Sequence, residues 1–334
     1  MMIPTIGDKF MQEERILVIG ACGQLGRELT QALKEKYGKK NVVASDIKEL
    51  SKSGYKELKY IRLDVTNKAH VLSIITDEKI TQVYHLAAML SATGEKDPHL
   101  AWQVNMDGLL NVLDVCVKRN VSKVFWPSSI AVFGPDSPKA SCSQNSYAVP
   151  TTVYGISKRS GEYWCKYYFD RYGLDVRSLR FPGLISYKVL PGGGTTDYAV
   201  DIFYKAKSGE KFTCFLDAET VLPMMFMNDA VRATLELMAA EKEKINIRTS
   251  YNLSAVSFSP SDLSTEIRKF EPGFEIEYAP DFRQAIADSW PAMINDNVAR
   301  HDWGWRHDFG LREIVGEMME HIIVEEKENV LLDK

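Results

Sequence analysis

The stretch from Arg15 to Leu33 constrains the fold more than any other part of the chain. It reads RILVIGACGQLGRELTQAL, a short apolar run followed at once by a glycine-rich turn and an amphipathic segment. An uninterrupted apolar run such as Ile16 to Ile19 is typical of a parallel strand that is covered on both faces. The apolar residues that follow the turn recur at helical spacing. The stretch therefore predicts the strand, turn and helix of a parallel α/β sheet.

The glycines of this turn, Gly20, Gly23 and Gly26, have the spacing GxxGxxG. In a dinucleotide site, the first glycine permits a tight turn, the second lets the backbone approach a phosphate, and the third lets the helix pack on the strand. A pyrophosphate would then bind the free N–H groups at the helix N-terminus. The motif alone leaves open the alternative of a helix that simply begins after a glycine-rich turn.

Asp46 stands 20 residues beyond the last of these glycines, at the end of a second strand predicted over residues 41–45. An acidic side chain in this position accepts hydrogen bonds from the adenosine ribose and repels a 2′-phosphate, so Asp46 favours NAD over NADP. A surface aspartate that caps a turn is the alternative. A third strand is predicted over 58–63, and Asp64 behind it is placed equally well to contact adenine or to cap the helix starting near Asn67.

The composition limits the classes of protein that this chain can be. Its 334 residues suffice for a nucleotide-binding domain with a smaller second lobe. A net charge of −4 gives no reason to expect nucleic acid or an anionic membrane as a partner, and no apolar run is long enough for a membrane span. The five cysteines, Cys22, Cys116, Cys142, Cys165 and Cys214, form no CxxC pair. We therefore expect a reducing compartment, without disulfides or a metal site.

Further strands are predicted over residues 82–88, 123–126 and 174–179. The first of them runs into a turn of small residues, HLAA, whose backbone can pass close to a cofactor. His85 lies inside this apolar strand, where a histidine is more often a hydrogen-bonded core residue than a ligand, so we assign it no chemistry. Asn105 interrupts the apolar face of a helix predicted over 100–118. A buried amide needs partners, so we expect Asn105 to support the active site through its backbone or through water.

Tyr154 and Lys158 stand four residues apart in VYGISK, which places both side chains on one face of a helix. A lysine ammonium beside a tyrosine stabilises the phenolate and lowers the pKa of the phenol toward the range of a general base. Ser129, which follows the strand over 123–126, can hold a substrate oxygen while Tyr154 moves the proton. The three residues form a set suited to alcohol oxidation. Without the upstream motif, Tyr154 and Lys158 fit an ordinary amphipathic helix equally well.

The order of the glycine turn, the strand-end aspartate, HLAA, SSIAVFG and YGISK resembles the extended short-chain dehydrogenase/reductase family over nearly the whole chain. Three longer blocks, residues 180–203, 222–238 and 281–291, resemble the short-chain type of L-threonine 3-dehydrogenase within it. The resemblance implies an α/β fold, a Rossmann doubly wound parallel sheet with a smaller C-terminal substrate lobe. It also implies NAD-dependent oxidation of L-threonine at its 3-hydroxyl to 2-amino-3-oxobutanoate, in threonine degradation toward glycine and acetyl-CoA or aminoacetone.

The resemblance also gives roles to individual residues. Ser129, Tyr154 and Lys158 become the catalytic residues, and Lys158 would also hold the nicotinamide ribose. The residues expected to contact NAD are Gly20, Gly23, Gln24, Leu25, Gly26, Asp46, Asp64, Val65, Leu86, Ala87, Ala88, Asn105, Tyr154, Lys158 and Pro182. The residues expected to bind the substrate are Ser91, Ser129, Tyr154, Gly183, Thr195, Thr196 and Trp290.

We expect one compact unit with two lobes. Residues 1–14 form a lead-in, 15–181 the NAD-binding domain with the catalytic residues, 182–326 mainly a substrate lobe interleaved with the last sheet strands, and 327–334 a tail. In the substrate lobe, the triple glycine over 192–194 is equally compatible with a simple loop and with a lid.

Two stretches around the catalytic helix carry further expectations. Residues 141–143 read Ser-Cys-Ser where relatives usually carry a Thr-Pro turn, which leaves the shape of this loop open. Short-chain relatives commonly pair the helices expected over 100–118 and 154–172 into a four-helix bundle. We therefore expect a homodimer, with aromatic contact area from Trp164, Tyr167 and Tyr168.

Two other functions stay open. A nucleotide-sugar 4-epimerase or dehydratase uses the same scaffold, but it would need cations to bind substrate phosphates, and residues 184–203 contain only Lys188. A redox-sensing protein that binds NAD without turnover is disfavoured by the complete catalytic set. The partners we expect are a small-molecule substrate and a second copy of the chain. The expected location is cytoplasmic in a bacterium and the mitochondrial matrix in a eukaryote.

Overall fold

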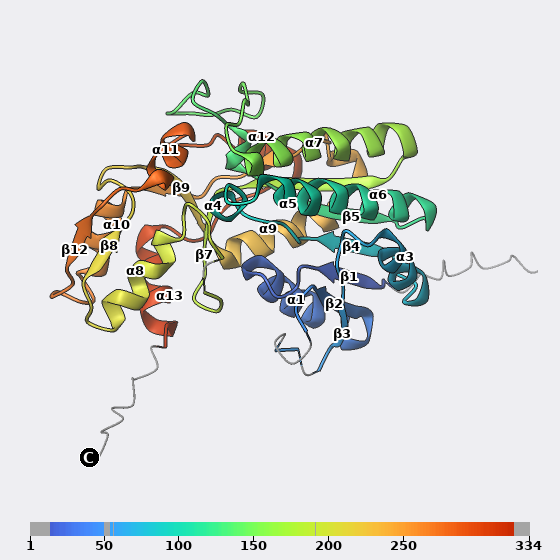
Figure 1. Ribbon diagram of the computed structural model, residues 1–334, viewed down its shortest axis with the longest axis horizontal. Helices are drawn as coiled ribbons and strands as arrows, with labels where there is room; N and C mark the ends of the chain where they lie inside the picture. The colour runs from blue at the N-terminus through green and yellow to red at the C-terminus, as the bar shows by residue number, and fades with distance from the viewer. Residues whose placement is uncertain (1–13, 50–53, 56, 191, 324–334) are drawn as a thin grey trace, which may run out of the picture.

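A seven-stranded parallel sheet in the order β10-β6-β5-β4-β1-β2-β3 forms the centre of the molecule (Figure 1). The computed structural model describes residues 14–49, 54–55, 57–190 and 192–323. The expected tail over 327–334 and all but the last residue of the expected lead-in lie outside these ranges. The strands of the sheet are β1 (Ile16–Ile19), β2 (Val42–Asp46), β3 (Lys59–Arg62), β4 (Gln82–His85), β5 (Lys123–Ser129), β6 (Asp175–Phe181) and β10 (Tyr251–Asn252).

The strands form where the sequence predicts them, with ends shifted by a few residues. Every residue of β1, β2, β4 and β6 is buried, as expected for parallel strands that are covered on both faces. The strand order reverses between β1 and β4, which in doubly wound sheets is the position of the ligand crevice. The predicted Rossmann fold is therefore confirmed.

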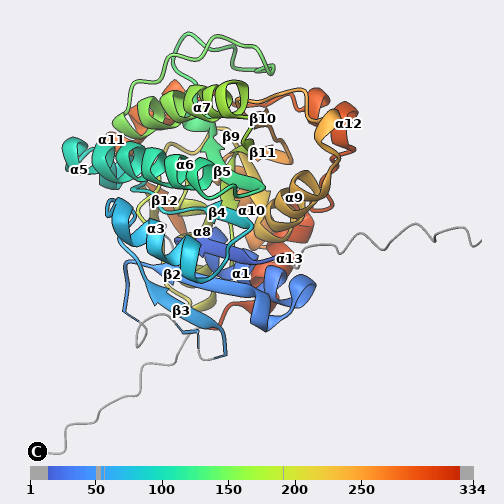
Figure 2. The same cartoon turned by 90° about the vertical axis from the view of Figure 1, so that its right-hand side faces the viewer.

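Helices cover both faces of the sheet (Figure 2). One face packs against α1 (Gln24–Tyr37), α9 (Met227–Ala239) and α12 (Asn297–Trp303), and the other against α3 (Lys68–Asp77), α6 (Gly108–Lys118) and α7 (Val153–Tyr172). Within the described part of the chain, none of the helices is both long and apolar enough to cross a membrane. The five cysteines, all within the described ranges, are buried and not joined by disulfides.

The helix predicted over residues 100–118 is present, but its middle is not α-helical. The chain forms α5 (Pro98–Trp102), a π-helical turn η2 (Gln103–Asp107) and then α6. The wide turn contains Asn105, whose side chain both accepts a hydrogen bond from the backbone N–H of Met89 at 2.8 Å and donates one to its carbonyl at 3.1 Å. These bonds to another segment hold the turn in a form that the apolar spacing alone does not indicate.

The C-terminal part of the chain adds two small sheets with their own helices. The first contains β7 (Gly183–Ile185), β9 (Leu222–Phe226) and β11 (Val256–Phe258), and the second contains β8 (Phe212–Cys214) and β12 (Ile276–Tyr278). Around them pack α8 (Tyr198–Lys207), α10 (Pro260–Ile267), α11 (Phe282–Ser289) and α13 (Leu311–His321). The strand β10 leaves this part to join the main sheet beside β6. The division into lobes at residue 181 stays a prediction.

Candidate active site

The glycine turn between β1 and α1 has the geometry that a pyrophosphate requires. Gly20 has a φ of +85°, and a Cβ on it would lie 2.6 Å from the backbone nitrogen of Ala87. A Cβ on Gly26 would lie 2.1 Å from the carbonyl oxygen of Gly20, whereas at Gly23 the nearest atom would be 3.5 Å away. Gly23 caps α1 without a side-chain bond, and the first turn of α1, all of it described, contains no acidic residue. The exposed helix N-terminus therefore suits an anion, and the residues fit a dinucleotide.

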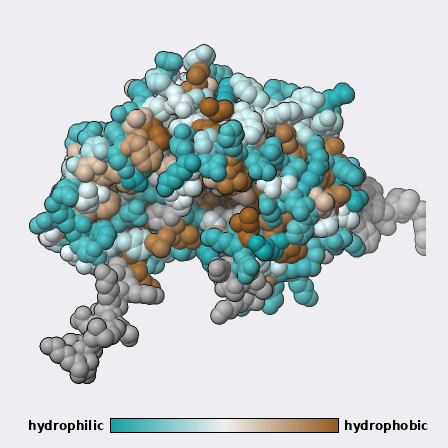
Figure 3. Space-filling model, in the orientation of Figure 1, coloured by the Kyte–Doolittle hydropathy of each residue, from teal (hydrophilic) through white to brown (hydrophobic). Residues whose placement is uncertain are grey.

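The glycine turn lies at the carboxyl edge of the sheet. There β1 pairs with β4 up to Ile19 and His85, and the segment after β4 leads to the short helix α4 (Ser91–Gly94). Figure 3 shows a hollow in this face of the molecule, near the middle of the view. Leu86, Ala87 and Ala88, which follow β4, are half-buried, and Pro182 is buried between β6 and β7. Their predicted contacts with NAD stay predictions.

Asp46 lies beside the glycine turn at the end of β2. Its carboxylate is buried and accepts hydrogen bonds from the backbone N–H of Cys22 at 2.9 Å and of Lys48 at 3.2 Å. The bond from Lys48 stabilises the turn that follows β2, and the bond from Cys22 stabilises the glycine turn. Its contact with the ribose stays a prediction.

Asp64 and Val65, shortly after β3, lie in different environments. Asp64 is exposed and accepts bonds from the backbone N–H and the hydroxyl of Thr66 at 2.9 and 2.7 Å. The alternative that Asp64 caps the next helix is wrong, because the side chain of Asn67 caps α3. Val65 is buried against α6, where a Cβ on Gly108 would lie 2.7 Å from it.

The three predicted catalytic residues come together where β5 ends and α7 begins. Ser129 is the last residue of β5, and Tyr154 and Lys158 occupy the first turns of α7. The helix can approach the strand end because Gly155 has no side chain, since a Cβ there would lie 2.1 Å from the carbonyl oxygen of Ala131. The predicted spacing on one helix face is confirmed.

The protonation of this set differs from the expectation. Burial raises the pKa of Tyr154 to about 12, and a hydrogen bond with Ser129 opposes the rise. Lys158 donates to the carbonyl of Pro127 at 2.6 Å, while its Nζ lies 5.6 Å from the centre of the Tyr154 ring. Burial lowers the pKa of Lys158 to about 7. In this structure the effect of burial on Tyr154 therefore outweighs the predicted lowering by Lys158.

Two pairs of the predicted substrate residues meet just before the start of α8. The hydroxyls of Ser91 and Thr195 lie 3.1 Å apart and are buried. Gly183 packs on Thr196, since a Cβ on it would lie 2.8 Å from that side chain. Trp290 is buried in the hydrophobic cluster against which Tyr154 packs. The structure thus brings Ser91 to Thr195 and Gly183 to Thr196, and it leaves the roles of all five as predictions.

The glycine turn over 192–194 sits against α4. A Cβ on Gly193 would lie 2.3 Å from the hydroxyl of Thr93. The carboxylate of Asp197 accepts hydrogen bonds from the N–H groups of Gly193 and Gly194 at 2.8 and 2.7 Å. The loop and lid alternatives both stay open.

Asn105 is hydrogen-bonded, whereas His85 departs from its expected environment. The side chain of Asn105 binds the backbone of Met89 directly and also donates to Ser157 at 3.2 Å, and its support of the active site stays a prediction. His85 is buried as expected, but within the described ranges neither ring nitrogen has a hydrogen-bond partner. Burial and the nearby Lys158 lower its pKa to about 3, so the ring is neutral.

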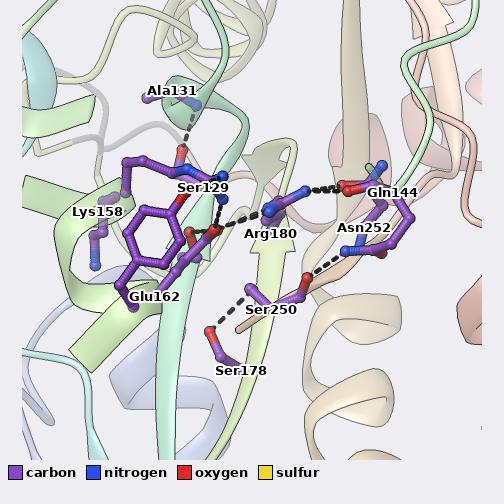
Figure 4. Close-up of polar contacts among 12 residues, drawn as sticks. Ser129, Ala131, Gln144, Lys158, Glu162, Ser178, Arg180, Ser250 and Asn252 are labelled. Carbon is purple, nitrogen blue, oxygen red and sulfur yellow. Dashed lines mark hydrogen bonds and ion pairs between the residues drawn. The ribbon is translucent and has the colours of Figure 1, made fainter. Parts of the chain in front are cut away.

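A buried polar network behind the catalytic residues was missed at the sequence level (Figure 4). Its members are Ser128, Gln144, Glu162, Arg180 and Asn252. The spacing of Glu162, four residues beyond Lys158, was a signal that it shares the catalytic face of α7. Its partner Arg180 lies on β6, and only the fold brings the two together.

The loop that contains Ser141-Cys142-Ser143, where the sequence departs from the family pattern, is held by contacts with a later segment. The backbone N–H of Cys142 donates to the carbonyl of Met293 at 3.0 Å, and Cys142 forms an isolated parallel bridge with Ile294. The amine of Lys139 donates to the carbonyl of Trp290 at 2.9 Å. The loop is therefore fastened to the segment that follows α11.

Known proteins resemble this chain over most of its length. The sequence pattern of the NAD dependent epimerase/dehydratase family matches residues 16–254. The mitochondrial L-threonine 3-dehydrogenase of Bos taurus is 44% identical over 308 residues, which are 92% of this chain and 82% of that protein. The L-threonine dehydrogenase of Cupriavidus necator in its holo form is 51% identical, with a TM-score of 0.90 over 92% of this chain and 99% of its own. A monomeric L-threonine 3-dehydrogenase from a metagenome database is 50% identical, with a TM-score of 0.89 over 92% and 98%.

Proposed function

The chain belongs to the NAD dependent epimerase/dehydratase family, and within it we propose that the protein is an NAD-dependent L-threonine 3-dehydrogenase. The observation that carries the proposal is the meeting of Ser129, at the end of β5, with Tyr154 and Lys158, one turn apart at the start of α7, at the carboxyl edge of a dinucleotide-type sheet. The choice of substrate is supported by the identity of 51% to a protein named L-threonine dehydrogenase.

The catalytic residues divide the proton chemistry between them. Ser129 donates a hydrogen bond to the 3-hydroxyl oxygen of threonine, and Tyr154 as phenolate accepts the hydroxyl proton. When bound, NAD accepts the hydride from C3, and the product is 2-amino-3-oxobutanoate. Because burial keeps the pKa of Tyr154 at about 12 even with Ser129 opposing the rise, the reaction at neutral pH needs positive charge close to the phenolate. Protonated Lys158 supplies that charge.

The cofactor and the substrate would lie side by side at the carboxyl edge of the sheet. The glycine turn and the N-terminus of α1 hold the pyrophosphate, and Asp46 holds the adenosine ribose and disfavours NADP. The remaining predicted cofactor residues line the path from the turn to Pro182. Ser91, Thr195, Thr196, Gly183 and Trp290 surround the amino acid.

The nucleotide-sugar alternative is weakened by a contact of Lys188, the single cation in residues 184–203. Its Nζ lies 3.1 Å from a carboxylate oxygen of Glu28, which also binds the hydroxyl of Ser186. An ammonium that already neutralises a buried carboxylate is poorly suited to bind a diphosphate.

We further infer a homodimer that pairs α6 and α7. Tyr163, Trp164, Tyr167 and Tyr172 of α7 are exposed, which leaves aromatic surface for a second copy. The expected contribution of Tyr168 is wrong, because this residue is buried in the core and hydrogen-bonded to Asp114. The role in threonine degradation, and a location in bacterial cytoplasm or eukaryotic mitochondrial matrix, belong to the same proposal.

The deciding experiment measures NADH formation by the purified protein with L-threonine, other 3-hydroxy amino acids and UDP-sugars. We expect L-threonine with NAD to be the preferred pair. A UDP-sugar that is converted faster than L-threonine would assign the protein to the epimerases. NAD binding without turnover of any substrate would identify a cofactor sensor.

A further inference from the structure

Three consecutive residues at the end of β5 each face one residue of α7. Pro127 bonds Lys158 at 2.6 Å, Ser128 bonds Glu162 at 2.7 Å, and the side chain of Ser129 is close enough to Tyr154 to oppose the rise in its pKa. Two of these pairs contain the catalytic residues, and the third contains a carboxylate that takes no part in the proposed reaction. All three contacts therefore fix the same alignment of α7 along the end of β5.

The carboxylate of Glu162 is fully buried and fully hydrogen-bonded. One oxygen accepts from the hydroxyl of Ser128 and from Nε of Arg180, both at 2.7 Å. The other accepts from Nη2 of Arg180 and from Nη1 of Arg159, both at 2.8 Å. A paired, two-point contact of this kind is directional, so it fixes the carboxylate relative to β6 as well as β5.

Arg180 extends this contact to two distant parts of the chain. Its Nη1 donates to the carbonyl of Gln144 at 3.1 Å and to the side-chain oxygen of Asn252 at 3.0 Å. The side-chain oxygen of Gln144 in turn accepts from the backbone N–H of Asn252 at 2.8 Å. Figure 4 shows the guanidinium between Glu162 on one side and Gln144 and Asn252 on the other. The pair thus joins α7 to β10 and to the loop over 134–152.

We propose that Glu162 and Arg180 are positioning residues of the active site. They hold α7 in register on β5, so that Tyr154 and Lys158 meet Ser129, and they make this register depend on the loop over 134–152. The inference rests on the proposed function in taking Ser129, Tyr154 and Lys158 as the catalytic set. A small rotation or slide of α7 would separate the hydroxyls, and misplacement by about 1 Å can cost on the order of 10²-fold in rate.

Glu162 also acts on Lys158 through its charge. It lies one turn further along α7, and its negative charge raises the pKa of Lys158 against the effect of burial. The other titratable groups that face Lys158 are Tyr154, His85 on β4 and Cys165 on α7. His85 is neutral at working pH. Removal of the Glu162 charge should therefore lower the pKa of Lys158 further.

The test compares Glu162→Gln with Asp175→Asn. Asp175 is also a buried carboxylate with arginine partners, Arg177 at 2.8 Å and Arg248 at 2.7 Å, but it lies at the opposite end of β6 from the catalytic residues. Both variants should lower the melting temperature. Only Glu162→Gln should lower kcat for L-threonine, by about 10-fold or more, and shift the pH dependence of kcat, with little change in KM.

A second measurement needs no substrate. The rate of Lys158 acetylation by acetic anhydride, followed by mass spectrometry over a pH series, reports the pKa of its amine. Glu162→Gln should move the midpoint to lower pH, and Asp175→Asn should leave it in place. This readout tests the effect of Glu162 on Lys158 even if L-threonine is not the substrate, whereas absent NADH formation by the wild type would overturn only the proposed function.

A Glu162→Gln variant that loses melting temperature, but keeps the wild-type kcat and the wild-type midpoint of Lys158, would make the pair purely structural. Should this variant fail to fold, Ser128→Ala takes its place, because it removes one of the four bonds without changing charge. We expect Ser128→Ala to lower kcat at a nearly unchanged melting temperature. An unchanged kcat would again overturn the proposal.

Discussion

The ammonium of Lys158 donates a hydrogen bond to the backbone carbonyl of Pro127 at 2.6 Å, in a position where only 3% of the residue is exposed. Burial lowers the pKa of this ammonium to about 7, from an ordinary value of 10.5. The charge that stabilises a Tyr154 phenolate is therefore itself sensitive to pH in the neutral range. A bound cofactor or substrate would add its own shift to the pKa of this amine.

The first prediction concerns stability. Between about pH 7 and 10 the unfolded chain binds a proton at Lys158 that the folded chain has lost, so this residue makes stability rise with pH by up to about 1.4 kcal/mol per unit. Below pH 7 the amine of Lys158 is protonated in both the folded and the unfolded chain, so the full free-energy cost of burying its charge lowers the stability. Lys158→Met should therefore stabilise the cofactor-free protein more at pH 6 than at pH 9 in urea unfolding. The exposed Lys166→Met is the control, and equal effects of Lys158→Met at both pH values would contradict the low pKa.

The second prediction separates proton transfer from cofactor binding. Tyr154→Phe should lose at least about 10²-fold in kcat, the usual scale for a general base. Its affinity for NAD should be unchanged, because the phenol oxygen is not needed to hold the pyrophosphate. Lys158→Ala should lose both turnover and NAD affinity. Calorimetric titration with NAD distinguishes the two variants, and a Tyr154→Phe enzyme with normal kcat would remove Tyr154 from the mechanism.

The third prediction concerns the choice between NAD and NADP. Asp46→Asn keeps an oxygen that can accept the N–H of Cys22, which Asp46 binds at 2.9 Å, but it removes the negative charge. The ratio of kcat/KM for NAD to that for NADP should fall, because repulsion of the 2′-phosphate is lost. A ratio equal to that of the wild type would show that another residue selects the cofactor.

The fourth prediction concerns assembly. Trp164 and Tyr167 are 38% and 46% exposed on α7 and pack edge to face with each other. Sedimentation at micromolar concentration should give a dimer, and Trp164→Glu should give a monomer, because a charge at the centre of an aromatic contact loses its solvation. Wild-type protein that sediments as a monomer, as the name of one similar protein describes, would refute the proposed contact.

The sequence by itself determined the elements whose function depends on spacing. The interval between Gly20, Gly23 and Gly26 predicted a turn with a free helix N-terminus, and the structure has it. The four-residue interval between Tyr154 and Lys158 predicted a shared helix face, and Ser129 followed from the end of a predicted strand. Period and chain order fix which residues share a face or a sheet edge, so local pattern is sufficient for these features.

Only the tertiary structure decided which polar groups meet and how their charges behave. Glu162 is paired with Arg180 on another element, and Asn105, in a π-helical turn, binds the backbone of Met89 on another segment. The pKa values of Tyr154 and Lys158 moved away from their ordinary range because neighbouring elements exclude water from both. Desolvation and pairing across the fold depend on residues distant in sequence, and the period of a single segment contains no information about them.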